Sequence, residues 1–340
     1  MTPQRLQDIT AKYNSLRIAI VGDFCLDRYL EIDPERAETS IETGLPVYNV
    51  VRTRAQPGAA GTVLNNLVAL GIGTIFPVGF CGEDGEGWEL KRSLQYLPGV
   101  SLEYFFATPE RRTFTYCKPL VMELSGPPRE LNRLDSKNWG PTSTTVSARL
   151  VAAIDALLPA VDAVIVLDQV DLAETGVVTA PVLSRFAAPG ARGKLVIADS
   201  RRGLRGYPPI VFKMNAAELA ALTGETETLS LEAVYSKARQ LAEQNGRDVF
   251  VTLSERGLVG ATARGEISHI PAYPVRGPID IVGAGDSVTA NLTAALAGGA
   301  SIAEALTLAA AASSIVIHEL GTTGTASVPQ IADLLRAYAS

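Results

Sequence analysis

Short apolar runs alternate with longer stretches of helical periodicity along most of the chain. The apolar runs, each short enough to form a buried strand, span residues 16–22, 73–80, 163–167, 194–198, 211–214 and 249–253. Segments with helical spacing lie between or after them, at residues 58–71, 84–97, 147–158, 174–186 and 287–297. This order predicts an α/β fold: a doubly wound, mostly parallel sheet with helices on both faces.

Two segments, residues 29–56 and 102–134, break the alternation. Both hold alternating apolar and polar positions, turn formers and no helical period, so we expect strands in both. They can pair into a small lid over the sheet, and we expect residues 1–340 to form a single domain that carries this lid. The aromatic run from Tyr104 to Phe106 could face a partner chain or be covered by the chain's own helices.

The turn at residues 280–286 reads Asp-Ile-Val-Gly-Ala-Gly-Asp and precedes the helical segment 287–297. A helix start presents backbone N–H groups without partners and the positive end of the helix dipole, and glycines there let an anion approach. Gly283, Ala284 and Gly285 therefore form a candidate phosphate site. Asp286 beside it could take a proton from an attacking hydroxyl, although an ordinary helix cap is the alternative interpretation.

Polar residues follow two of the predicted strands. Asp23 and Asp27 come after the first strand, at the sheet edge where open α/β folds bind ligands, although nearby backbone amides could satisfy either acid. Lys213, near the end of a later strand, could meet phosphate. Asn215 and Glu218 could organise a hydrated Mg²⁺, or they could form a capping box at a helix start.

Composition narrows the class of protein. A hydrophobic content of 47% over 340 residues supports a large core, and a net charge of -6 argues against a general nucleic-acid binder. Three scattered cysteines and an N-terminus without a basic–apolar leader favour a cytoplasmic protein with reduced thiols. The apolar region 288–317 is interrupted at residues 298–301, so we expect core helices there rather than a membrane span. His269 and His318 lack metal-ligand spacing and are interpreted as structural.

These motifs resemble the ribokinase-like (PfkB) family of sugar kinases over nearly the whole chain. The small-residue turn and helix at residues 58–71 are similar to one family signature, and Asp-x-x-Gly-Ala-Gly-Asp at residues 280–286 matches the other without a gap. Within the family the likeness is to the heptose-7-phosphate kinases, and it is carried by residues 22–29, 46–47, 132–135, 252–257 and 320–322. Bifunctional versions continue into a nucleotidyltransferase domain, and we expect these 340 residues to hold the kinase part only.

The resemblance implies a role for each candidate residue. Asp286 would be the general base, and the amides of Gly283, Ala284 and Gly285 would stabilise the γ-phosphoryl group of ATP. The substrate would be bound by Asp23, Asp27, Gly58, Thr62 and Asn66. The nucleotide would lie along Lys213, Asn215, Glu218, Thr252, Ser254 and Gly257. Mg²⁺ would lie near Asn215 and Glu218, held through water, and a monovalent cation such as K⁺ near Asp280.

Three positions depart from the family pattern. Ala59 stands where the first signature has its second glycine, and Thr62 where it has a sugar-contacting asparagine. Ala310 stands where an asparagine often lies beside the adenine. A threonine offers one hydroxyl in place of an amide that both donates and accepts, so recognition of the sugar hydroxyls should differ.

We therefore predict an ATP-dependent sugar or sugar-phosphate kinase, with heptose 7-phosphate as one candidate acceptor. Two alternatives stay open: a kinase for another small polyol (a hexose, a pentose or a nucleoside), and a catalytically silent sugar- or nucleotide-binding protein on the kinase fold. The three departures support the silent protein, and the retained Asp286 argues against it. We expect a homodimer, as in relatives with strand-rich lids, and no nucleic-acid or membrane partner.

Overall fold

The computed structural model describes residues 1–123, 125–191, 193–321 and 323–338. The main sheet consists of β1 (Arg17–Gly22), β6 (Thr74–Gly82), β7 (Phe105–Thr108), β10 (Ala163–Asp168), β11 (Leu195–Ser200), β12 (Val211–Asn215), β13 (Val249–Thr252), β14 (Leu258–Ala261) and β15 (Ile267–Ile270). Their order is β15-β14-β13-β12-β11-β10-β1-β6-β7. Pairing is parallel from β7 through β13, and β14 and β15 add antiparallel pairs at one edge.

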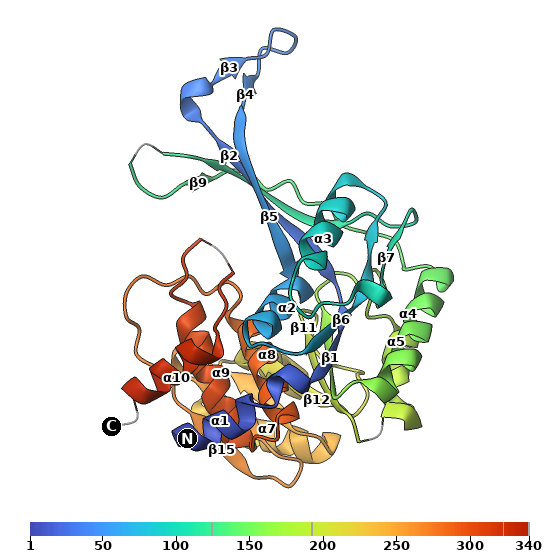
Figure 1. Cartoon of the computed structure of the whole chain (residues 1–340), viewed down its shortest axis with the longest axis vertical. Helices are drawn as coiled ribbons and strands as arrows, with labels where there is room; N and C mark the ends of the chain where they lie inside the picture. The colour runs from blue at the N-terminus through green and yellow to red at the C-terminus, as the bar shows by residue number, and fades with distance from the viewer. Residues whose placement is uncertain (124, 192, 322, 339–340) are drawn as a thin grey trace.

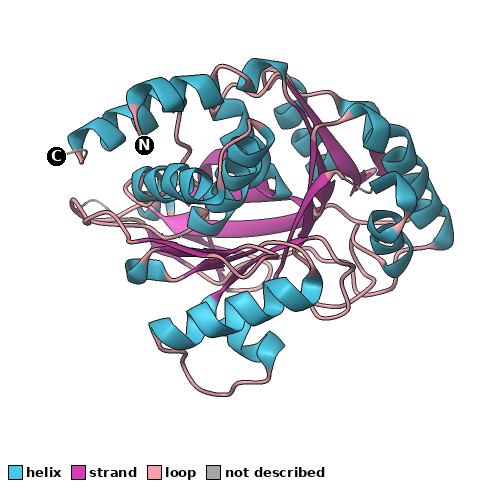
Figure 2. Ribbon diagram, turned by 90° about the horizontal axis from the view of Figure 1, so that it is seen from below, coloured by secondary structure: helices cyan, strands magenta, loops and turns pink. Residues whose placement is uncertain are grey.

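Helices cover both faces of this sheet, as Figure 2 shows. They are α1 (Pro3–Thr10), α2 (Ala60–Ala69), α3 (Gly85–Gln95), α4 (Thr144–Leu157), α5 (Ala180–Ala187), α6 (Ala216–Thr223), α7 (Leu231–Asn245), α8 (Ala284–Ala297), α9 (Ile302–Val316) and α10 (Val328–Ala337). The helices α4 to α7 contribute to the core on one face, and the other helices to the core on the opposite face. The predicted doubly wound α/β fold is confirmed.

Strand β1 illustrates how the sequence builds these two cores. Ile18 and Ile20 pack in one apolar cluster and Ala19 and Val21 in the other, because successive side chains of a strand point to opposite faces. A strand buried on both faces is apolar throughout, which explains why the short apolar runs predicted the main strands.

The lid is a second sheet that rises away from the body of the molecule (Figure 1). Its strands are β2 (Phe24–Ile32), β5 (Val50–Ala59), β8 (Phe114–Val121) and β9 (Arg129–Glu130), in the order β5-β2-β8-β9, and the short strands β3 (Glu38–Thr39) and β4 (Pro46–Val47) pair near its tip. The lid therefore begins at residue 24, earlier than the predicted residue 29.

Part of the predicted lid segment 102–134 belongs to the main sheet instead. Strand β7 pairs in parallel with β6, which takes Phe105 and Phe106 into the body, where they are 4% and 6% exposed. The aromatic run is thus largely covered by the chain itself rather than presented to a partner. Burial of apolar surface stabilises this placement, because Phe105 packs in one core cluster and Phe106 in the other.

Two helix boundaries differ from the prediction. Helix α5 begins at Ala180 rather than at residue 174, with an extended Thr179 as N-cap and Pro181 in its first turn, whereas Glu174 has a positive φ of 63°. Helix α8 begins at Ala284, three residues before the predicted start at residue 287.

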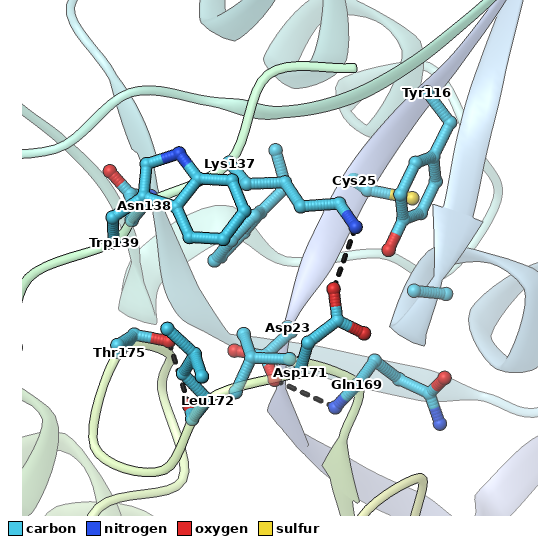
Figure 3. Close-up of a pocket in the computed structure, with 13 residues that line it drawn as sticks. Asp23, Cys25, Tyr116, Lys137, Asn138, Trp139, Gln169, Asp171, Leu172 and Thr175 are labelled. Carbon is cyan, nitrogen blue, oxygen red and sulfur yellow. Dashed lines mark hydrogen bonds and ion pairs between the residues drawn. The ribbon is translucent and has the colours of Figure 1, made fainter. Parts of the chain in front are cut away.

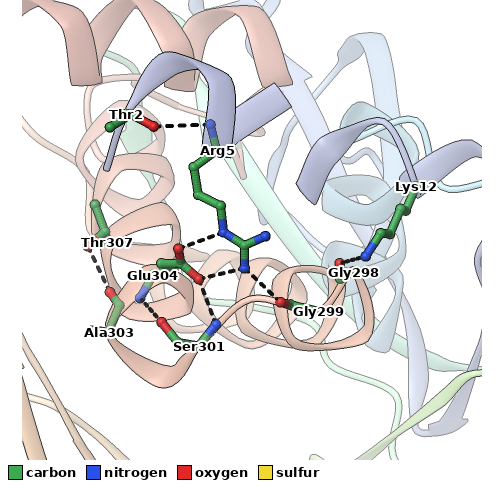
Figure 4. A network of polar contacts seen from close by, with 9 residues as sticks. All are labelled: Thr2, Arg5, Lys12, Gly298, Gly299, Ser301, Ala303, Glu304 and Thr307. Carbon is green, nitrogen blue, oxygen red and sulfur yellow. Dashed lines mark hydrogen bonds and ion pairs between the residues drawn. The ribbon is translucent and has the colours of Figure 1, made fainter. Parts of the chain in front are cut away.

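Residues of α1 and of the segment that follows it bind the turn between α8 and α9 (Figure 4). Arg5 Nε lies 2.7 Å from Glu304 Oε1, and Arg5 Nη2 donates to the carbonyl oxygen of Gly299 at 2.9 Å. Lys12 Nζ donates to the carbonyl oxygen of Gly298, the C-cap of α8, also at 2.9 Å. Cations at the C-terminal end of a helix interact favourably with its dipole, so these contacts stabilise the far end of α8.

Candidate active site

The turn at residues 280–286 leads into α8, and Gly283 is the N-cap with a φ of 83°, a conformation that glycine adopts readily. Asp286 is the third residue of the helix and is partly exposed. Burial raises the pKa of its carboxyl group to about 7, and the charge of Asp199 adds to the rise while that of Lys213 opposes it. A general base works best with a pKa near the operating pH.

A buried ion pair lies close to the start of α8. Lys213 Nζ is 2.7 Å from Asp199 Oδ2, and both residues are less than a tenth exposed. Thr289 of α8 donates its hydroxyl to the same Asp199 oxygen at 3.1 Å. Burial by itself lowers the pKa of Lys213, but its pKa is raised overall, mainly by Asp199 and then by the charge of Asp286.

The ion pair fixes a positive charge next to the candidate phosphate site. Lys213 Nζ lies 3.2 Å from the position that a Cβ on Gly285 would take. The ammonium group is therefore beside the backbone amides at the start of α8. This is where the sequence analysis places phosphate.

Asp27 and Gly58 meet at the root of the lid, where β2 pairs with β5. A Cβ on Gly58 would lie 2.5 Å from Asp27 Oδ2, so a larger residue there would displace the Asp27 carboxylate. Burial raises the pKa of Asp27, whereas the charges of Lys118 and Arg133 lower it. Asp27 is also close enough to Asp286 for its charge to raise the pKa of that carboxyl. The structure thus brings together the predicted sugar-binding and catalytic carboxylates.

Asp23, the other acid that follows β1, is almost fully buried and is held by the backbone. Its Oδ2 accepts the N–H of Gln169 at 2.8 Å, and its Oδ1 accepts the N–H of Val177 at 2.7 Å. Burial, followed by the charge of Asp168, raises its pKa to about 7. These contacts fit the alternative interpretation, an acid satisfied by backbone amides, while its role in substrate binding stays a prediction.

Thr62 and Asn66 lie on the buried face of α2. Thr62 is 2% exposed, and its Cγ2 is 3.4 Å from the position that a Cβ on Gly283 would take. Asn66, one turn later, is fully buried and donates Nδ2 to the carbonyl oxygen of Thr62 at 3.0 Å. Burial of this face agrees with a packing role for Asn66, and its contact with substrate stays a prediction.

A cavity of about 750 Å³ opens beside the start of α8. The residues singled out in the sequence that line it are Thr252, Ser254, Gly257, Ala284, Gly285 and Ala310. Much of the remaining lining is apolar and includes Tyr273, Val275 and Ile279. Ligand pockets typically have roughly 300–1,000 Å³ and a mostly apolar lining with a few polar groups. The cavity therefore suits a nucleotide whose phosphates reach Gly285.

Asn215 and Glu218 form a reciprocal capping box at the start of α6. Asn215 Oδ1 accepts the N–H of Glu218 at 2.9 Å, and Glu218 Oε2 accepts the N–H of Asn215 at 2.7 Å. Over the described residues, no group of three or more His, Cys, Asp or Glu side chains could hold a metal ion. The second carboxylate oxygen of Glu218 still fits a Mg²⁺ ion that keeps most of its waters.

Asp280 closes the turn before α8. Its Oδ1 accepts the N–H of Val282 at 3.0 Å, and its own N–H donates to the carbonyl oxygen of Ile317 at 2.8 Å. The second carboxylate oxygen offers a hard ligand of the kind that a monovalent cation would need. Of the motif at residues 320–322, Thr322 lies outside the described residues.

A charged cluster that the sequence analysis missed surrounds a narrow cavity next to Asp23 (Figure 3). Lys137 Nζ lies 2.6 Å from Asp171 Oδ2. Arg201 Nη1 lies 3.6 Å from Asp171 Oδ1 and 3.4 Å from the hydroxyl oxygen of Tyr116. The cavity has a volume of about 20 Å³, room for little more than one water molecule. Asp171 and Arg201 follow β10 and β11, so their place at strand ends is the signal that could have found them.

One face of the lid continues this cluster. The parallel pairing of β2 with β8 puts Asp27 beside Tyr116 and Tyr29 beside Lys118. The Arg133 guanidinium is 4.8 Å from the ring centre of Tyr116, and Lys118 Nζ is 5.0 Å from that of Tyr29. We call these cations the basic cluster: Lys118, Arg133, Lys137 and Arg201. Lys118 and Arg133 act on the charge of Asp27, and Lys137 lines the narrow cavity.

The fold and this site point to a class: a doubly wound sheet, a lid, a candidate anion site at a helix start and a carboxylate beside it are the parts expected of a small-molecule kinase. Comparison with known families agrees. Residues 197–329 match the family described as "pfkB family carbohydrate kinase", which confirms the predicted resemblance.

Curated relatives match nearly the whole chain. The "Bifunctional protein HldE" of Rhodospirillum rubrum is 34% identical over 336 residues, which cover 98% of this chain and 64% of that protein. The protein of the same name from Gluconacetobacter diazotrophicus is 31% identical over 328 residues, covering 96% of this chain and 65% of that protein. The chain thus spans less than two thirds of the length of these relatives.

Solved structures share the fold. Arabidopsis thaliana ribokinase, complexed with ribose and ATP, superposes with a TM-score of 0.65 at 20% identity and covers 94% of this chain and 98% of its own. Phosphofructokinase-2 from Escherichia coli, in complex with substrates and products, gives a TM-score of 0.71 at 18% identity over 96% of this chain and 100% of its own. Across the described residues, no helix is long and apolar enough to cross a membrane.

Proposed function

We propose that this chain is an ATP-dependent sugar kinase that transfers the γ-phosphoryl group to a sugar hydroxyl at the start of α8. The observation that carries the proposal is the partly exposed Asp286, with its raised pKa, in the same helix turn as Gly285 of the nucleotide cavity. Asp23 has a similarly raised pKa but is held by backbone amides, whereas Asp286 lies in the first turn of α8 beside the candidate phosphate site, which favours a kinase over a catalytically silent binding protein.

Asp286 takes the proton from the acceptor hydroxyl as that oxygen attacks the γ-phosphorus in line with the departing ADP. The backbone amides at Gly283, Ala284 and Gly285 stabilise the charge on the transferred group, for which the N–H of Ala284 would release its 3.2 Å hydrogen bond to the carbonyl oxygen of Ile281. Lys213 adds a positive charge next to the transferred group, because its ion pair with Asp199 holds the ammonium group beside Gly285. These groups are held by the fold before substrate binds, so little reorganisation is needed during the reaction.

ATP lies in the large cavity, with its base against the apolar wall that includes Ala310 and its ribose and phosphates toward Thr252, Ser254 and Gly257. Bound Mg²⁺ would offset the charge of the phosphates, and Asn215 and Glu218 are the residues that would hold its waters. Asp280 would hold K⁺ behind the turn. Ala310 offers only a methyl group where an amide could bond to the base, so nucleotide selectivity is expected to be weak.

The acceptor is a sugar that already carries a phosphate, and heptose 7-phosphate is the first candidate. The basic cluster supports this choice, since the charges of Lys118 and Arg133 act on Asp27, which would bind a sugar hydroxyl. Arginine and lysine side chains are the usual ligands of a phosphate group. Lys118 and Arg133, which lies 3.0 Å from Asp135, are therefore candidates to bind the phosphate that an unphosphorylated hexose, pentose or nucleoside lacks, so these acceptors take second place.

The assembly is a homodimer in the cytoplasm, where ATP is the donor and the three buried cysteines stay as free thiols. Exposed apolar side chains on the outer half of the lid support pairing with a second copy: Ile41, Leu45, Tyr48, Val50 and Val51. An apolar patch of this kind on a strand-rich extension marks an interaction surface. Sedimentation at micromolar concentration tests the homodimer, because a protein that sediments as a monomer would contradict it.

The activity is tested by ADP release over a panel of acceptors, with and without Mg²⁺ and K⁺. The panel contains heptose, hexose and pentose phosphates and the matching free sugars. We expect turnover that needs Mg²⁺ and prefers phosphorylated acceptors, with Arg133→Gln reducing that preference while the KM for ATP stays constant. Tight sugar or nucleotide binding without turnover on any acceptor would favour the silent binding protein instead.

A further inference from the structure

Ala59 has a backbone conformation that L-amino acids rarely adopt. It is the N-cap of α2, with a φ of 52° and a ψ of -116°. These are the angles of the first central residue of a type II′ turn, a position dominated by glycine. Among the described residues, Glu174 and Ser254 are the other non-glycine positions with positive φ. Such strain persists only where the surrounding structure enforces it, and it collects at ligand sites.

The contacts around Ala59 enforce this turn. The pairing of β5 with β2 continues to Ala59 itself. On one side Gly58 is held against the carboxylate of Asp27, with 2.5 Å between Oδ2 and the position of a Cβ. On the other side the N–H of Ala60 donates to the carbonyl oxygen of Asp23 at 3.0 Å. The chain must therefore turn at residue 59, whichever side chain stands there.

The methyl group of Ala59 lies where it can affect the acceptor. It packs against one apolar core cluster, and the residue borders the narrow cavity together with Cys25 and Tyr116. Cys25 is close to the reacting groups: burial is the main cause of its raised pKa, and the charges of Asp27 and Asp286 add to it. Because the cavity holds only about 20 Å³, one methyl group changes the available room by a large fraction.

We propose that the Ala59 methyl group sets the size limit of the acceptor, by filling space beside the narrow cavity that a glycine would leave open to an additional carbon of the sugar. The inference rests on the proposed function, because it concerns the acceptor of that reaction. It also gives the strained alanine a role, since a glycine would relax the backbone and lose the size limit.

The test compares Ala59→Gly with Ala60→Gly, the same chemical change one residue along. For each protein, kcat/KM is measured with a seven-carbon and an eight-carbon sugar phosphate, together with the KM for ATP and the Tm. In Ala59→Gly the kcat/KM ratio should shift about tenfold or more toward the larger acceptor, since one methyl group in a pocket is worth about 10–200-fold. The KM for ATP should not change.

The melting temperature gives an independent readout of the strain. Ala59→Gly should raise the Tm by about 2 °C or more, although glycine usually destabilises a protein. Ala60 is fully buried in the first turn of α2 and has no such strain. Its replacement by glycine should lower the Tm and leave the acceptor ratio as in the wild type.

An acceptor ratio in Ala59→Gly within about twofold of the wild type would overturn the inference, even if the Tm rises. If the wild type phosphorylates no acceptor, the proposed function fails by itself. The two sugar phosphates are then compared by their dissociation constants, measured by calorimetry in wild type and Ala59→Gly. An unchanged ratio of these constants, or no binding of either sugar phosphate to either protein, also overturns the role of Ala59.

Discussion

Charged groups of opposite character lie beside the two ends of helix α8. Beside its start, the Asp199–Lys213 pair is buried, and the pKa of Asp286 is raised to about 7, mainly by burial. At its end, Glu304 and Arg5 are partly exposed, and the hydrogen bond from Arg5 is the main cause that lowers the pKa of Glu304 to about 2. The first end is arranged for proton transfer, and the second end holds the helix in place.

The directions of the two pKa shifts distinguish a carboxyl group suited to catalysis from one that stabilises the fold. A shift that favours the neutral carboxyl costs stability at neutral pH, and at Asp286 it suits a group that accepts a proton. A shift that favours the charged carboxylate contributes stability and needs no chemistry to explain it. Variants at each end of the helix test these two roles separately.

The largest stability effect is expected at the buried pair. Asp199→Asn keeps the shape but leaves the Lys213 charge without its counter-charge, which should cost about 3–5 kcal/mol in the free energy of unfolding. Urea denaturation measures this cost. The double variant Asp199→Asn, Lys213→Met removes both charges and should recover most of the loss. If the double variant is as unstable as the sum of the single variants, the two residues do not act as a pair.

The next effect concerns the pH dependence of the reaction. Asp286 must be deprotonated to act as the base, and its pKa is raised to about 7. The value of kcat/KM should therefore fall about tenfold for each pH unit below 7 and level off above it. If kcat/KM is constant from pH 5 to 8, under conditions where the protein stays folded, Asp286 is not the general base.

The smallest effect is expected at the exposed end. Glu304→Gln keeps the capping box with Ser301 but removes the charge that pairs with Arg5. At pH 7 the Tm should fall by no more than about 2 °C, and kcat should stay at its wild-type value. The pKa of Glu304 is lowered on folding, so its contribution is present above pH 4 and is lost as the pH falls toward 2. The Tm difference should shrink over the same range.

Local motifs were predictable from the sequence, since their signals lie within a few residues. The capping box of Asn215 and Glu218 and the placement of Asp286 in the first turn of α8 are of this kind. The start of α5 was placed too early because Glu174, with its positive φ, belongs to the loop before Thr179 and Pro181.

Contacts between distant segments were not predictable. Lys137, Asp171 and Arg201 come from three loops and meet only because β10 and β11 are neighbours and the segment after β9 returns beside them. Nothing near Asp199 or Lys213 in the sequence indicates that they pair across adjacent strands. The strain at Ala59 likewise becomes visible only in its backbone angles.

The most direct test of the central claim is single-turnover transfer from γ-labelled ATP in wild type and Asp286→Asn, with ATP binding measured in parallel. The wild type should move the label onto the sugar. Asp286→Asn should bind ATP with nearly the same affinity and transfer the label about 10²–10⁴-fold more slowly. Transfer at the wild-type rate in Asp286→Asn would contradict the assignment of a proton-accepting carboxylate at the start of α8.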